Sequence, residues 1–102
     1  MQHDVFVNPN PQTRPGFPFI AVLQADVAES KERIVAPMVP ASDLSRAAAR
    51  MTPVVNLEGR AYHLMVPLMV LVPTARLTKP VGTIRAHRDD IVRAIDWLFC
   101  GL

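Results

Sequence analysis

The ten prolines of this 102-residue chain constrain its fold more than any other feature of the sequence. All of them lie between Pro9 and Pro80, and the remaining end of the chain contains none. A proline supplies no backbone N–H, so within a sheet it is tolerated only at strand ends, edges or bulges. We therefore expect short, proline-bounded strands in a curled sheet before Pro80 and an uninterrupted helix at the end of the chain.

The composition predicts one compact domain spanning residues 1–102. Half of the residues are hydrophobic and 20% are charged, which is too apolar for a disordered chain. A chain of this length has room for one core. The net charge of +2 gives no strong basic field, so direct binding to nucleic acid, which needs several phosphate contacts, is not indicated.

Cysteine and histidine usage indicates a protein without a metal or other cofactor. The single cysteine cannot form an internal disulfide, which fits a reducing cytoplasm. The residues that could supply a zinc site lack the usual number and spacing; they are Cys100, His3, His63 and His87.

No membrane or export segment is expected. The opening residues have no cationic region followed by an apolar stretch, unlike a secretory signal. The longest apolar run, residues 64–73, is about half of the ~20 residues that span a bilayer, and Pro67 interrupts it. We expect a soluble protein.

Short apolar runs predict the strands. The second and third are expected to pair as a hairpin across a charged turn, and the fourth and fifth across a turn that contains Gly59. These strands are expected within residues 5–7, 17–27, 33–38, 54–57, 61–65 and 68–72, the last continuing past a kink through 74–77.

Two helices are expected. A capping residue followed by strong helix formers predicts a short helix over residues 42–50. The proline-free end predicts a longer amphipathic helix with acidic residues near its beginning and a glycine cap at its end. Its apolar face is expected to contain Ile84, Ile91, Ile95 and Leu98, widened by Val92 and Phe99.

Motifs for catalysis are scarce. The sequence has no glycine-rich phosphate loop, zinc-protease motif or nucleophile elbow. His63 alternates with its strand neighbours, which favours a solvent-facing or partner-facing side chain, and residues 87–90 are typical of a solvated first helical turn. A ribonuclease would need an acid or base beside an arginine; the sequence places none beside Arg14, Arg33 or Arg60.

The apolar end of the chain allows two interpretations. Phe99 and Leu102 could fold back onto the core, as in an ordinary domain. Alternatively, they could form an exposed tip that docks on a partner, because apolar anchors can dominate an interface. The residues alone leave both open.

The chain resembles the CcdB family, the gyrase-poisoning toxins of toxin-antitoxin modules. The resemblance rests on the order and spacing of several segments and on the total length. These segments are residues 1–6, 19–27, 33–38, 53–57, 69–73 and 90–102. The resemblance implies a mainly β (β+α) fold, an SH3-like barrel of antiparallel strands with a C-terminal helix, assembled as a homodimer.

The family resemblance also implies partners and contact residues. The toxin dimer would bind the A subunits of DNA gyrase and trap the enzyme on cleaved DNA, while a CcdA-like antitoxin would neutralise it. The toxin-antitoxin complex would repress its own operon, so contact with DNA is indirect. The implied gyrase-binding residues are Asp96, Trp97, Phe99, Cys100, Gly101, Leu102, Ala25, Val27, Ala28 and His3. The implied antitoxin-binding residues are Asn8, Asn10, Arg14, Ser42, Asp43 and Arg46, and no catalytic residue is implied.

The sequence departs from the family pattern at its end. Well-known members end in Trp-Gly-Ile, whereas this chain ends in Cys100-Gly101-Leu102. Loss of a stacked aromatic could remove ~0.5–2 kcal/mol of cation–π attraction together with its buried area. Trp97 lies one helical turn earlier and either replaces that ring in part or packs in the core or dimer seam. Position 3 is His where Phe is common, and position 25 is Ala where Ser is common.

Three functions remain open at this point. The first is a gyrase-directed toxin that acts by binding. The second is an endoribonuclease, since the MazF and Kid toxins share the barrel. The third is a divergent dimer that binds an antitoxin but no longer poisons gyrase.

Overall fold

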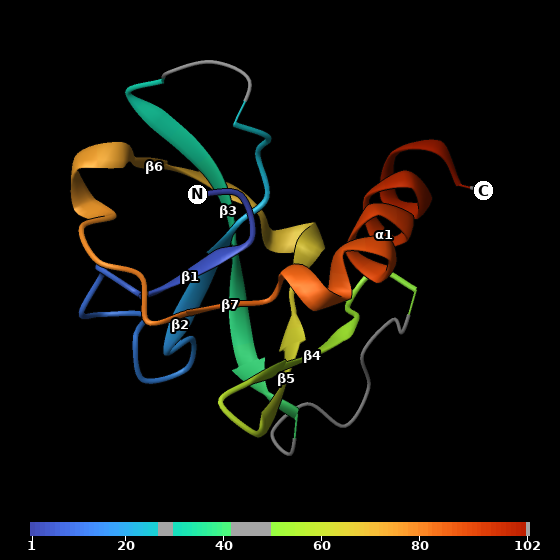
Figure 1. Ribbon diagram of the computed structural model, residues 1–102, viewed down its shortest axis with the longest axis horizontal. Coiled ribbons are helices and arrows are strands. Elements are labelled where there is room, and N and C mark those ends of the chain that lie inside the picture. Colours follow the sequence, from blue (N-terminus) through green and yellow to red (C-terminus); the bar gives the residue numbers. More distant parts are fainter. Residues whose placement is uncertain (27–29, 42–49, 102) are drawn as a thin grey trace.

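The structure, a computed structural model, describes residues 1–26, 30–41 and 50–101. Within these residues an antiparallel sheet is followed by one long helix at the end of the chain (Figure 1). The elements are β1 (Asp4–Val7), β2 (Phe19–Val22), β3 (Glu32–Pro40), β4 (Val54–Leu57), β5 (Arg60–Leu64), β6 (Val70–Pro73), β7 (Gly82–Thr83) and α1 (Arg88–Cys100), with short 3-10 turns at Val66–Leu68, Thr74–Arg76 and Arg85–His87.

The long strand β3 organises the sheet. Its first half pairs with β6, its second half pairs with β5, and β2 runs along its other edge. The strand order is β4-β5-β3-β2-β1-β7, with β6 attached to β3 outside this path. All of these pairings are antiparallel, which confirms the predicted hairpins.

The two ends of this strand order approach each other. A Cβ atom placed on Gly82 of β7 would lie 2.6 Å from Cδ1 of Leu57 in β4. Only a glycine allows so close an approach between the terminal strands. The sheet is therefore a nearly closed barrel, and the predicted β+α barrel fold is confirmed.

The β4–β5 hairpin closes through a two-residue turn. Glu58 and Gly59 both have positive φ angles, 51° and 79°, and Leu57 pairs with Arg60. Two consecutive positive φ angles are typical of the type I′ turn, whose twist matches that of the flanking strands.

Buried residues fill both faces of the sheet. The larger cluster lies under α1 and includes Met38, Leu64 and Ile91. A smaller cluster occupies the opposite face and includes Ile20 and Val35. The alternation of side chains along each strand separates the two clusters.

Helix α1 has the acidic residues near its beginning and the glycine cap at its end that its sequence predicts. Asp89 and Asp90 lie in the first turn, where negative charge is favourable. Gly101 adopts the left-handed conformation, with φ 70°, and its amide donates to the carbonyl of Trp97. This is the usual glycine cap.

Several expected boundaries were wrong. Residues 74–76 form a 3-10 turn and do not extend β6, because β3 begins at Glu32, which pairs with Pro73, and offers no further partner. Leu68 belongs to a 3-10 turn. Residues 85–87 form a separate turn before α1, and the two-residue strand β7 was not predicted.

The expected helix over residues 42–50 lies almost wholly outside the described residues. Of this segment only Arg50 is described, and it lies in a turn. No helix in the described part of the chain is long and apolar enough to cross a membrane.

Candidate functional site

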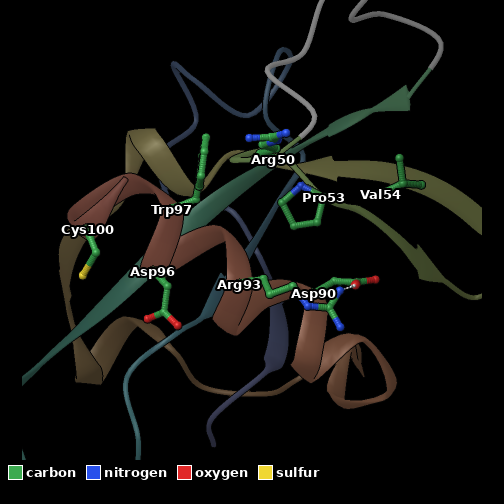
Figure 2. A pocket seen from close by; sticks show the side chains of 8 residues that line it. All are labelled: Arg50, Pro53, Val54, Asp90, Arg93, Asp96, Trp97 and Cys100. Carbon is green, nitrogen blue, oxygen red and sulfur yellow. Dashed lines mark hydrogen bonds and ion pairs between the residues drawn. The ribbon is translucent and has the colours of Figure 1, made fainter. Parts of the chain in front are cut away.

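One face of α1 forms the wall of a surface groove of about 830 Å³ (Figure 2). The helical side chains that line it include Asp90, Arg93, Trp97 and Cys100, which recur every three or four residues and so project from the same side of the helix. The opposite wall comes from the residues before β4 and from β4 itself. The groove is lined by Arg50, Pro53, Val54, Asp90, Arg93, Asp96, Trp97 and Cys100.

A cation–π contact forms one end of this groove. The guanidinium carbon of Arg50 lies 4.3 Å from the ring centroid of Trp97, whose side chain is partly buried. Figure 2 shows the two side chains next to each other at the top of the groove. Trp97 is thus neither a core residue nor a free aromatic surface, because the protein's own arginine covers one face of its ring.

Two carboxylates in the groove have different surroundings. Asp90 accepts a 3.0 Å hydrogen bond from Nη1 of Arg93, one helical turn later. Asp96 is exposed and has no such partner in the part of the chain that the structure describes. Asp96 is therefore available to pair with a donor from another molecule.

Phe99 projects from a neighbouring side of the helix. Phe99 is 69% exposed, the largest value among the exposed large hydrophobic residues that the structure describes. Val92, seven residues earlier, is also exposed. The expectation that these two residues widen the buried face was therefore wrong, because only Ile91 and Ala94 of α1 are fully buried.

The last turn of the helix is open to solvent. Cys100 is exposed with a free thiol, and Gly101 is exposed. The sequence allowed this end of the chain either to fold back onto the core or to form an exposed tip. Phe99 is exposed, as expected for a tip. Leu102, also predicted at this tip, lies outside the described residues.

The second predicted group of gyrase contacts lies around the beginning of the chain. Ala25 is exposed at the end of the segment that follows β2. The neighbouring Asp26 accepts hydrogen bonds from the Gln2 amide (3.0 Å) and the Met1 ammonium (2.9 Å), which lower the pKa of its carboxyl in that order. Val27 and Ala28 lie outside the described residues.

His3 is buried, with 3% of its surface exposed. Burial, reinforced by the positive charges of Arg88 and Arg85, lowers the pKa of its ring. Its carbonyl accepts a hydrogen bond from the Ile84 amide, four residues before α1 begins. His3 therefore lies near the opposite end of α1 from Phe99 and Cys100 and can support a surface only from beneath.

The predicted antitoxin contacts on the loop after β1 differ in exposure. Asn8 is buried; its Nδ2 donates to Thr13 and Phe17, and its Oδ1 accepts from the Asn10 amide. Asn10 and Arg14 are exposed, and Arg14 Nε donates to the Asn8 carbonyl. The other predicted contacts, Ser42, Asp43 and Arg46, lie outside the described residues.

The histidines considered as catalytic bases have backbone partners. His63 Nδ1 lies 3.1 Å from the Thr52 carbonyl, and His87 Nε2 accepts from the Asn56 amide at 3.1 Å. Arg33 is buried, with Nη1 3.6 Å from Asp26. Within the described residues no group of His, Cys, Asp or Glu side chains is arranged to hold a metal ion.

The chain matches the family model described as CcdB protein over residues 2–101, nearly its whole length. The chain belongs to the CcdB family. Among curated proteins no sequence matches it significantly. Membership in the CcdB family makes the protein a toxin of the toxin-antitoxin type.

Sequence reasoning named Asp96, Trp97 and Cys100 of this groove but missed its other residues. Arg50 was not predicted to take part, because it is far from Trp97 in the sequence and only the fold brings them together. Arg93 and Asp90 were also missed, although their spacing of three residues is the signal of a helical ion pair.

Proposed function

We propose that this CcdB-family toxin acts by binding the A subunits of DNA gyrase and trapping the enzyme on cleaved DNA. The observation that carries the proposal is the exposed end of α1. A phenylalanine that is 69% exposed lies three residues after the exposed carboxylate of Asp96. Apolar anchors of this kind often supply most of an interface's binding energy.

The gyrase surface in this proposal has Phe99 as its apolar anchor. Asp96 lies beside it as an acceptor for a basic group, and Cys100 and Gly101 complete the last turn. Leu102, Ala25, Val27 and Ala28 stay in the proposal as further contacts. His3 supports the surface indirectly, because its side chain is buried.

Trp97 contributes to this surface with one ring face at most. The other face carries Arg50, so an incoming arginine would have to displace that guanidinium or use the remaining face. An exposed cation–π contact is worth about 0.5–1 kcal/mol. Trp97 is therefore a weaker platform than a free terminal tryptophan.

We further propose that the protein is a homodimer that acts without an active site of its own. A CcdA-like antitoxin would neutralise it, and the complex would repress its own operon. Asn10 and Arg14 are the exposed described residues of the proposed antitoxin surface. Asn8 would shape that surface through the three hydrogen bonds of its side chain.

Expression of the protein in bacteria tests the main proposal. We expect growth arrest in a strain with ordinary gyrase and normal growth in a strain with a resistant gyrase A allele. With purified gyrase, ATP and circular DNA, the protein should produce linear DNA. Equal arrest in both strains, without linear DNA, would contradict gyrase as the target.

Two substitutions at the helix end test the contact residues. Cys100→Trp should strengthen binding to gyrase A by about tenfold, since it restores a stacking ring. Trp97→Ala should weaken binding only if the remaining ring face contributes. Unchanged affinity for Trp97→Ala would show that this ring does not replace the missing terminal tryptophan.

An endoribonuclease is the alternative that the barrel fold allows, but no described cluster favours it. His63 and His87 have backbone partners and His3 is buried, while Arg14 contacts its own loop. Incubation with RNA and a scan for sequence-specific fragments separates the two functions.

A further inference from the structure

The surface groove between α1 and β4 contains two arginines whose surroundings differ (Figure 2). Nη1 of Arg93 donates to Oδ1 of Asp90 at 3.0 Å, so this guanidinium is already paired within the helix. Arg50 is exposed, and its guanidinium has neither a hydrogen bond nor an ion pair with any residue that the structure describes. Arg50 is therefore the cation that the groove leaves available to another molecule.

The ring of Trp97 holds Arg50 in place. The guanidinium carbon of Arg50 lies over this ring, 4.3 Å from the ring centroid, and Trp97 is itself partly buried on α1. A guanidinium that lies over an aromatic face keeps N–H donors free around its edge. The contact also restricts the side chain beforehand, so less conformational entropy is lost when a partner binds it. Arg50 is thus a positioned donor rather than a freely moving surface arginine.

The free donors of Arg50 select an acidic group. The planar fork of a guanidinium matches the two oxygens of a carboxylate. A basic group would instead have to compete with Arg50 for the ring of Trp97. A phosphodiester chain is disfavoured, because Asp90 and Asp96 also line the groove and the net charge of the chain is only +2. A single carboxylate side chain of a protein fits these charges best.

The rest of the lining suits the segment that carries this carboxylate. Pro53 and Val54 form an apolar wall, and Val54 is 50% exposed. The volume of about 830 Å³ is larger than one carboxylate needs, so neighbouring residues of the partner enter the groove as well. In Figure 2 Arg50 lies beside the Trp97 ring, whereas Asp96 projects lower from the helix. A segment with an acidic residue and a separate basic residue therefore matches both charges.

We propose that Arg50, positioned by Trp97, is a specificity-determining residue that binds an acidic side chain of the gyrase A subunit. The inference rests on the proposed function, because Asp96, Trp97 and Cys100 belong both to this groove and to the proposed gyrase surface. It adds a contact residue that the family resemblance does not imply. The target must then present an acidic group to Arg50 in addition to a basic group for Asp96.

Binding of the gyrase A subunit to Arg50 variants of the full-length protein tests the proposal. Arg50→Gln should raise the dissociation constant by about tenfold, the effect of losing one hydrogen bond between charged groups. Arg50→Lys keeps the charge without the planar fork and should give a smaller loss. The affinity of the original protein should also fall more steeply with salt concentration than that of Arg50→Gln, because the variant lacks one ion pair.

Arg60→Gln is the matched control, because Arg60 is an exposed arginine of β5 that does not line the groove. It should leave the dissociation constant within about twofold of the original, as expected for a side chain outside the contact. Unchanged binding by Arg50→Gln would overturn the proposal. Tighter binding by Arg50→Gln would overturn it as well, since the guanidinium would then only shield the Trp97 ring from a basic group of the target.

A charge exchange identifies the acidic group on the target. Arg50→Glu should raise the dissociation constant by about a hundredfold, because two carboxylates would then face each other. The exposed acidic residues of the gyrase A subunit are replaced with Lys one at a time, and one of these replacements should restore binding to Arg50→Glu. If none of them does, Arg50 does not contact an acidic side chain of gyrase.

Tryptophan fluorescence separates this inference from the proposed function. Trp97 is the single tryptophan of the chain, so its emission reports on this groove. Titration with a short glutamate peptide should change the emission of the original protein but not that of Arg50→Gln. Failure of the original protein to bind gyrase A would refute the proposed target, while this titration would still decide whether Arg50 binds a carboxylate. Equal responses of the original protein and Arg50→Gln would show that it does not.

Discussion

The inner and outer faces of α1 both contain apolar side chains, but only the inner side chains are covered. Ile91 and Ala94 pack into the main core, with Ile95 and Leu98 partly buried beside them. Phe99 and Val92 project from the outer side and are exposed. Burial of apolar area on the inner face stabilises the fold, whereas the same chemistry on the outer face is available to a partner.

This difference separates stability from binding within one 13-residue helix. A substitution on the inner face should change the free energy of unfolding, and one on the outer face should change the affinity for gyrase.

Ile91→Ala should have the largest effect. Ile91 has no exposed surface, so truncation leaves a cavity and should lower the free energy of unfolding by about 2–5 kcal/mol. Chemical denaturation measures this change. A loss below about 0.5 kcal/mol would mean that the helix contributes little to the core.

Phe99→Ser should weaken gyrase binding by about 2 kcal/mol or more, which is roughly thirtyfold, with little change in stability. The reason is that its ring makes few contacts in the free protein. Binding to gyrase A and chemical denaturation are measured on the same sample. A large loss of stability with unchanged affinity would reverse the roles assigned to the two faces.

The sequence predicted the strands and the helix that are recognisable from a pattern of neighbouring residues. Continuous apolar runs identified β2 and β3, and helical periodicity identified the inner residues of α1. Periodicity could not separate Phe99 from the buried face, because the width of that face depends on which strands pack beneath it. Likewise β7 has two residues and forms only because β1, from the other end of the chain, lies next to it.

The site was predicted less completely than the fold. The resemblance to the CcdB family supplied Asp96 and Phe99, but the Arg50–Trp97 contact joins residues far apart in the sequence. The chemistry of each residue was visible in the sequence, while their proximity required the folded backbone.

The Arg50–Trp97 pair lies at the boundary between the two faces. A double-mutant cycle with Arg50→Ala and Trp97→Leu should give a coupling of about 0.5–1 kcal/mol in the free energy of unfolding. Arg60→Ala, at an exposed arginine of β5, serves as the control and should show no coupling to Trp97. Zero coupling at Arg50 would show that the contact does not hold the ring.

Substitution of His3, a polar residue buried near the beginning of α1, should have the smallest effect on stability. Its pKa in the folded protein is lowered from 6.5, so the unfolded chain binds the proton more readily. The stability that comes from burying a neutral His3 is therefore fully present above pH 6.5. It is lost as the pH falls below 6.5 toward the pKa of the folded protein.

His3→Phe removes the titrating group and should flatten the pH dependence of the melting temperature below pH 6.5. Asp26 is the control, since its pKa is lowered from 3.8 and its effect should appear only at more acidic pH. An unchanged slope in His3→Phe would assign the dependence to another group.

The contact between His87 and β4 has a consequence for how the protein behaves at high concentration. The Asn56 amide belongs to a terminal strand of the sheet, where another chain could add by backbone pairing. The imidazole Nε2 already accepts that hydrogen bond, so one position of the ladder is closed to an incoming strand. His87, which lies just before α1, thus shields a position of the sheet edge at which the backbone of a second chain could otherwise pair.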